Sequence, residues 1–170
     1  AYSFWRDDRP FIFLNNFKTP EHSVYDCAHE IAHLILHRHQ GPKHARNTEH
    51  EADVFASAFL MPRRDVRARL PRRMTTDAII NAKARWRVSA MALAYRLRDI
   101  GVLSDWQYRS TCIELSKRGY RSGEPVGIER DHSVIWQKVL ANLWAERTTK
   151  AEIAQNLNIP LDELESLIFG

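Results

Sequence analysis

Histidines are concentrated in one part of this chain of 170 residues, where seven of the eight lie within residues 22–50. The motif H-E-I-A-H begins at His29 and places Glu30 between His29 and His33. Residues four apart share one face of a helix, so the two imidazoles can bind the same metal ion. Glu30 lies about 100° around the helix, where it can reach a water molecule at the metal without displacing an imidazole. Two neutral ring nitrogens beside a carboxylate base predict a hydrolytic zinc site, with Zn²⁺ as the cofactor.

The third ligand of such a site is predicted to come from a second helix. Glu49 and Asp53 stand four residues apart and share one face of that helix. Glu49 can supply the carboxylate oxygen of a site with two histidines and one glutamate, while Asp53 can accept the free N–H of a ligating histidine. Glu51 is the alternative ligand. On a regular helix it lies about 160° around from Glu49 and Asp53, and it has a local role as the capping-box partner of Thr48.

A histidine is the other alternative for the third ligand. His39 follows His29 by ten residues, the separation found in the longer pattern H-E-x-x-H-x-x-G-x-x-H. The glycine of that pattern turns the chain back toward the metal, but Leu36 occupies its place here, within a helical run. We therefore favour Glu49 over His39, and His37 is weaker still.

One strand and two helices are predicted to position these residues. Residues 11–14 are short, apolar and aromatic, which predicts a strand. Apolar residues recur at helical spacing over 24–37 and predict the first helix. The second helix is predicted to begin near Thr48 and to end at Met61, before a proline.

The rest of the chain is predicted to be helical. Thr76, Ser89 and Ser104 are candidate N-caps, and the capping box Thr149-x-x-Glu152 predicts a further helix. The predicted helices end at Trp86, at Ile100 before Gly101, and at Lys117. A loop with glycine, proline and serine over 119–127 is the expected boundary. We expect a predominantly helical α+β fold with a short N-terminal β element, divided into a domain over 1–118, which contains the predicted zinc site, and a helical C-terminal region over 119–170.

Composition excludes several classes of protein. Hydrophobic residues are 44% and charged residues 27%, which excludes a disordered chain and a fibrous repeat. No apolar run approaches the ~20 residues of a membrane helix, so we expect a cytoplasmic protein with no membrane partner. Cys27 and Cys112 stand far apart, which suits a reducing compartment. Because the chain begins at Ala1, close to a predicted strand, we expect a fragment of a longer protein.

Three motifs together resemble the ImmA/IrrE family of zinc metallopeptidases, small relatives of the gluzincins. They are H-E-I-A-H from His29, E-x-E-A-D-x-F-A from Glu49, and F-L-M-P from Phe59. The similarity covers roughly the first 105 residues. One departure is Val24-Tyr25-Asp26, where the family often has Arg-Phe-Thr.

The resemblance implies a minimal zincin fold with the metal bound by His29, His33 and Glu49 and with Glu30 as the general base. Family members are typically intracellular proteases of narrow specificity that often cleave a DNA-binding repressor. We therefore expect a zinc-dependent endopeptidase with a protein substrate. The substrate is expected to bind as an extended chain that pairs with the edge of strand 11–14. The alternatives are a DNA-binding regulator or sensor with a non-catalytic peptidase-like domain, and a purely structural metal site. Candidates for a second donor to the oxyanion are Tyr25, Tyr95, Arg96 and His132.

Two features that suggest DNA binding are interpreted otherwise. The net charge is +4, and arginines cluster over 63–73, but no aromatic residue stands among them for stacking on bases. Residues 149–169 have the outline of a helix-turn-helix, yet the presumed recognition helix carries Asp162, Glu163 and Glu165, which would repel phosphates. We expect no direct binding of nucleic acid by this chain. Four tryptophans at apolar helical positions are expected in the core: Trp86, Trp106, Trp136 and Trp144.

Overall fold

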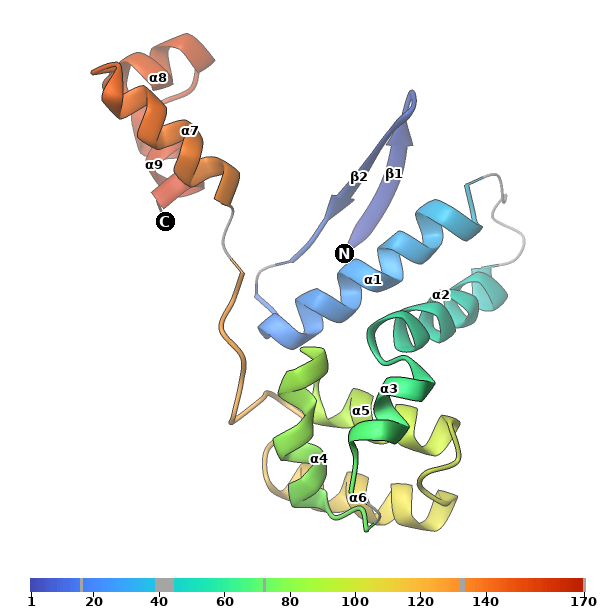
Figure 1. Ribbon diagram of the computed structural model, residues 1–170. Coiled ribbons are helices and arrows are strands. Elements are labelled where there is room, and N and C mark those ends of the chain that lie inside the picture. The colour runs from blue at the N-terminus through green and yellow to red at the C-terminus, as the bar shows by residue number, and fades with distance from the viewer. Residues whose placement is uncertain (16, 39–44, 72, 132–133, 170) are drawn as a thin grey trace. The chain divides into compact units, whose positions relative to one another are not determined.

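The computed structural model describes residues 1–15, 17–38, 45–71, 73–131 and 134–169. The described chain consists of helices and one two-stranded sheet (Figure 1), which confirms the predicted helical α+β fold. It forms two compact units, Ala1–Glu129 and Arg130–Gly170. Residues 119–129 belong to the first unit, and the domain division at residue 118 stays a prediction. No helix of the described residues is long and apolar enough to cross a membrane.

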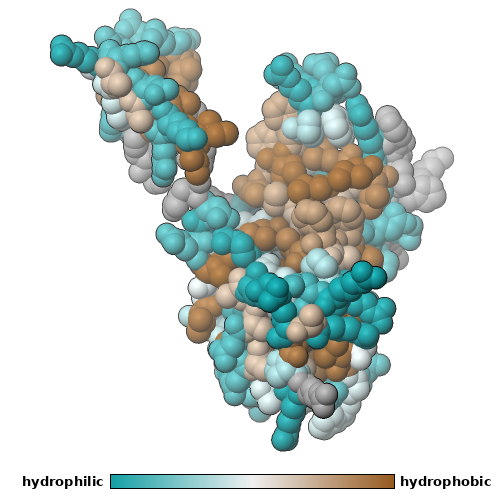
Figure 2. Space-filling model, in the orientation of Figure 1, coloured by the Kyte–Doolittle hydropathy of each residue, from teal (hydrophilic) through white to brown (hydrophobic). Residues whose placement is uncertain are grey.

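The sheet is a hairpin with two different faces. Strands β1 (Tyr2–Arg6) and β2 (Arg9–Phe13) pair antiparallel. The strand predicted at 11–14 corresponds to β2 as far as Phe13, and Leu14 lies beyond its end. Because side chains alternate along a strand, Ser3 and Trp5 point to helix α1 (Pro20–Leu36), where the Trp5 indole N–H donates to the Leu34 carbonyl at 3.2 Å. The opposite face carries four stacked and exposed aromatic rings, those of Tyr2, Phe4, Phe11 and Phe13. Figure 2 shows hydrophobic surface over the hairpin.

Helix α1 packs against helix α2 (Ala45–Leu60), which runs beside it in Figure 1. The Thr19 hydroxyl accepts from the His22 N–H and caps α1, which therefore starts one turn before the predicted residue 24. Helix α2 also starts early, at Ala45, so the predicted capping box of Thr48 and Glu51 is wrong. Thr48 lies inside the helix, and the Glu51 carboxylate accepts from Asn47 instead of serving the helix end.

The core of the first unit lies among the helices that follow. These are α3 (Arg63–Arg69), α4 (Thr76–Ala82), the 3-10 segment η2 (Lys83–Trp86), α5 (Ala90–Asp99) and α6 (Asp105–Lys117). The predicted caps Ser89 and Ser104 are confirmed, the latter in a capping box with Gln107, whereas α4 is capped by Thr75 rather than Thr76. Buried residues from these helices form one cluster, including Met61, Val66, Ile79, Leu93, Leu97 and Leu115.

The tryptophan prediction holds for Trp86, which is buried, but is wrong for two others. Trp106 is 76% exposed and Trp144 is 41% exposed. Trp106 precedes the buried Leu115 by nine residues, which is about half a turn out of phase on a helix, so it faces away from the core. The side chain of Trp136 lies outside the described residues.

Three buried charged side chains join distant parts of the first unit. Lys83 Nζ lies 2.9 Å from Glu21 Oε1 and 2.9 Å from Glu124 Oε2, and none of the three side chains is more than 1% exposed. Glu21 also accepts from the Ile128 N–H at 2.9 Å. This group, the Lys83 triad, fastens the loop before residue 129 to the first turn of α1.

The second unit consists of α7 (Val134–Ala145), α8 (Lys150–Leu157) and α9 (Leu161–Phe169) in its described part. The predicted capping box of Thr149 and Glu152 is confirmed at the start of α8. Ile153, Ala154 and Leu164 form its small buried cluster.

Candidate metal centre

Small residues let the two site helices approach each other closely. Ala28 and Ala32 on α1 and Ala52 and Ala56 on α2 are all buried, and each pair is spaced four residues apart. His29 and His33 each follow one of the α1 alanines by one residue. The helix period therefore turns both rings toward the edge of the contact, where α2 presents its own polar side chains.

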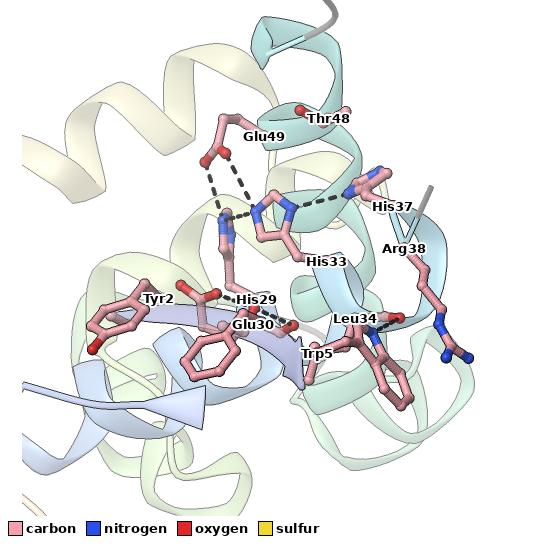
Figure 3. A pocket seen from close by; sticks show the side chains of 13 residues that line it. Tyr2, Trp5, His29, Glu30, His33, Leu34, His37, Arg38, Thr48 and Glu49 are labelled. Atoms are coloured by element: carbon pink, nitrogen blue, oxygen red, sulfur yellow. Dashed lines mark hydrogen bonds and ion pairs between the residues drawn. The ribbon is translucent and has the colours of Figure 1, made fainter. Parts of the chain in front are cut away.

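Three side chains meet at this edge (Figure 3). His29 Nε2 lies 3.2 Å from Glu49 Oε2, His33 Nε2 lies 3.3 Å from Glu49 Oε1, and the two Nε2 atoms are 3.0 Å apart. Tetrahedral zinc with bonds of about 2.0–2.1 Å places its ligand atoms roughly 3.3 Å from one another. Each histidine faces a different oxygen of Glu49, and one ligand atom from each of the three residues lies within 4.8 Å of the others. The two imidazoles and the carboxylate can therefore hold one divalent cation, and the structure brings together the residues predicted as ligands.

Asp53 holds the first histidine. Its Oδ1 lies 3.0 Å from His29 Nδ1, so the ring donates its Nδ1–H to the carboxylate and leaves the Nε2 lone pair available to a metal ion. This is the position predicted for Asp53. Glu51, the alternative ligand, lies away from the three donor atoms and contacts His37 instead, with 3.0 Å between His37 Nε2 and Glu51 Oε2.

The second histidine has a partner that the sequence analysis did not assign. His33 Nδ1 lies 3.0 Å from His37 Nδ1, and the His37 side chain is only 6% exposed. Burial lowers the pKa of His33, with smaller opposing effects from the charges of Glu49 and Glu30. A lowered pKa keeps the ring neutral, as metal binding requires. The spacing of four residues between His33 and His37 is the feature of the sequence from which this contact could have been predicted.

Glu30 lies beside the three donor atoms and has its own partner. The Ser3 hydroxyl on β1 donates to Glu30 Oε2 at 2.7 Å. Glu30 lines a cavity of about 650 Å³ together with His29, His33 and Glu49 (Figure 3), and residues 1–5 form another wall of it. A carboxylate fixed by one oxygen beside a metal-binding group is arranged to take a proton from a water molecule in this cavity.

Three of the four candidates for a second oxyanion donor do not line the cavity beside Glu30: Tyr25, Tyr95 and Arg96. Tyr25 and Tyr95 line a separate cavity of about 250 Å³, where the Tyr25 hydroxyl donates to the Asp53 carbonyl at 3.2 Å. Burial, helped by the charge of Asp53, raises the pKa of Tyr25 to about 12. Arg96 is buried and donates to the Met61 carbonyl at 3.1 Å, which is a structural role. His39 and His132 lie outside the described residues.

Comparison with known protein families gives a match over the first part of the chain. Residues 1–98 match the family model of the IrrE N-terminal-like domain, a peptidase family, over more than half of the chain. The matched segment runs from β1 into α5 and contains all the residues of the metal centre. No curated protein and no solved structure matches the chain.

Proposed function

We propose that this chain, which belongs to the peptidase family of the IrrE N-terminal-like domain, is a zinc-dependent endopeptidase of narrow specificity. The observation that carries the proposal is the convergence of His29, His33 and Glu49, whose ligand atoms lie within 4.8 Å of one another, close enough to bind the same metal ion. When bound, zinc supplies a Lewis acid that stabilises negative charge on the oxygen of the scissile carbonyl.

The chain's own residues perform the proton transfers of peptide hydrolysis. Glu30 takes a proton from the attacking water and later delivers it to the nitrogen of the leaving amine. Ser3 holds one oxygen of Glu30, which leaves the other free to receive the proton. Asp53 keeps His29 in the tautomer that presents Nε2 to the metal.

The wall formed by residues 1–5 supports an extended peptide as the substrate. β1 borders the cavity, so β1, rather than β2 with residues 11–13, is the strand whose edge could pair with a substrate backbone. A substrate bound as an added strand must be locally unfolded, which restricts cleavage to an exposed loop or linker. We propose a regulatory protein, such as a transcriptional repressor, as the substrate.

Co-expression with proteins encoded by adjacent genes tests this function. The wild-type chain should release a new fragment, detected by mass, and Glu30→Gln should lower the cleavage rate by about 10²–10⁴-fold while still binding zinc. Glu163→Gln, on α9 of the second unit, is the control and should cleave normally. Full cleavage by Glu30→Gln, or a wild-type chain that binds no zinc, would refute the proposal.

A further inference from the structure

A line of hydrogen-bonding groups leads away from the metal centre across both helices. It starts at His33 Nδ1, passes through the two ring nitrogens of His37, and reaches Glu51 Oε2, with separations of 3.0 Å and 3.0 Å. Asn47 donates to the other oxygen of Glu51. The contact between His33 and His37 is drawn in Figure 3.

The hydrogens of this line can be placed in only one consistent way when a metal is bound. His33 must keep the Nε2 lone pair for the metal, so its proton is on Nδ1 and is donated to His37 Nδ1. His37 accepts at Nδ1 and therefore carries its own proton on Nε2, which it donates to Glu51. Glu51 is a carboxylate and accepts from both His37 and Asn47.

We propose that His37 and Glu51 are positioning residues that fix the tautomer and ring orientation of His33 for metal binding. The inference rests on the proposed function, because it takes His33 as a ligand. His29 reaches its carboxylate, Asp53, directly, whereas His33 reaches Glu51 through one intervening imidazole. Each ligating histidine is thereby held from its second ring nitrogen by a carboxylate of α2.

The helix geometry explains why His37 is needed as a link. Glu51 stands two residues from both Glu49 and Asp53, so its carboxylate leaves α2 about 160° around from theirs. His37 is the C-cap residue of α1, four residues after His33, and its backbone N–H donates to the His33 carbonyl, so it lies one turn further along from His33. The imidazole of His37 therefore lies between His33 Nδ1 and the carboxylate of Glu51, which does not contact His33 directly. The His37 side chain is 6% exposed, so water competes little for its hydrogen bonds.

Zinc affinity, measured by competition with a chromogenic chelator, tests this role without any substrate. We expect His37→Leu to weaken zinc binding 10–100-fold, the usual effect of losing the outer partner of a ligating histidine. His37→Gln carries an acceptor and a donor on one amide group and should recover most of the affinity. Glu51→Ala should weaken binding in the same direction as His37→Leu. His50→Leu, exposed on α2, is the matched control and should bind zinc as the wild type does.

Two further measurements separate positioning from a structural role. The absorption spectrum of the Co²⁺-loaded protein should change in His37→Leu and return toward the wild-type spectrum in His37→Gln. The melting temperature of the metal-free protein shows whether a variant still folds. If His37→Leu does not fold, Glu51→Ala decides the question, because this side chain is 44% exposed and its removal leaves the core intact.

The outcomes distinguish this inference from the proposed function. Suppose that the wild type binds zinc and that folded His37→Leu binds it with the same affinity. This result overturns the positioning role and leaves the endopeptidase proposal standing. If His37→Leu does not fold, unchanged affinity in Glu51→Ala leads to the same conclusion. Equal loss of affinity in His37→Leu and His37→Gln also overturns it, because the loss would then follow from packing. A wild-type chain without zinc affinity overturns both.

Discussion

Removing the ammonium group of Lys83 should strongly destabilise the first unit. Lys83 Nζ lies 2.9 Å from a carboxylate oxygen of both Glu21 and Glu124, and all three side chains are at most 1% exposed. Lys83→Met keeps the unbranched stem but leaves two buried carboxylates facing each other without a cation. Breaking a buried ion pair by removing one partner costs about 3–5 kcal/mol, and we expect a loss in this range in the free energy of unfolding at pH 8.

The size of the loss should depend on pH in a defined direction. In the wild type, burial would raise the pKa of Glu21, but hydrogen bonds from Lys83 and from backbone N–H groups outweigh it, so its pKa lies below the ordinary 4.5. Burial raises the pKa of Glu124 above 4.5, and Lys83 only partly offsets this. The carboxylate of Glu21 thus adds stability above pH 4.5 that is lost on acidification, while Glu124 acts in the opposite sense.

Without Lys83, burial raises the pKa of both carboxyl groups. Groups with a raised pKa stabilise the folded state below pH 4.5 and lose that contribution as the pH rises through the folded value. The variant should therefore recover part of its stability on acidification. A recovery of about 1–2 kcal/mol between pH 8 and pH 5, relative to the wild type, corresponds to roughly one unit of pKa.

Urea unfolding followed by circular dichroism at pH 8 and pH 5 measures both effects. Lys18→Met is the matched control, since it removes the same group from the surface pair of Lys18 and Asp26. It should cost no more than about 1 kcal/mol at either pH. A loss below 1 kcal/mol for Lys83→Met, or an equal loss at both pH values, would show that the triad is not a stabilising buried network.

One further substitution tests a single hydrogen bond, and another tests backbone strain. Ser3→Ala removes the hydrogen bond that orients Glu30. We expect kcat to fall about fivefold, equivalent to about 1 kcal/mol, while the zinc affinity stays unchanged. The assay is cleavage of the co-expressed substrate, and the control variant is Ser110→Ala on α6. Gly101 has φ of 72° and open space at its Cβ, so Gly101→Ala should cost about 1–2 kcal/mol through backbone strain alone. Gly123→Ala, which has equal space and no positive φ, should leave the melting temperature unchanged; similar melting temperatures for the two variants would refute the strain argument.

The sequence predicts relations within one helix better than relations between distant segments. The period of a helix fixes that His29 shares a face with His33 and that Glu49 shares one with Asp53, and the structure has both pairs at the same site. The start of α2 was predicted one turn late, because Thr48 and Glu51 form a capping-box pattern that the actual helix does not use. A local pattern of this kind identifies a possible helix end without excluding an earlier one.

Contacts across elements depend on features that local patterns do not contain. The hydrogen bond from Ser3 to Glu30 requires that β1 lies over α1. In the Lys83 triad, Lys83 bonds to Glu21, which is 62 positions earlier in the chain, and to Glu124 in the loop that precedes residue 129. Neither follows from periodicity. The alanines are an intermediate case, since Ala28, Ala32, Ala52 and Ala56 repeat at the helical spacing and mark the two faces that approach each other. Once those faces are paired, the rotation of each helix is set and brings Glu49 to the two histidines. The contact of Glu51 with His37 is not contained in that rotation, because Glu51 lies about 160° around α2 from Glu49 and His37 is the C-cap residue of α1.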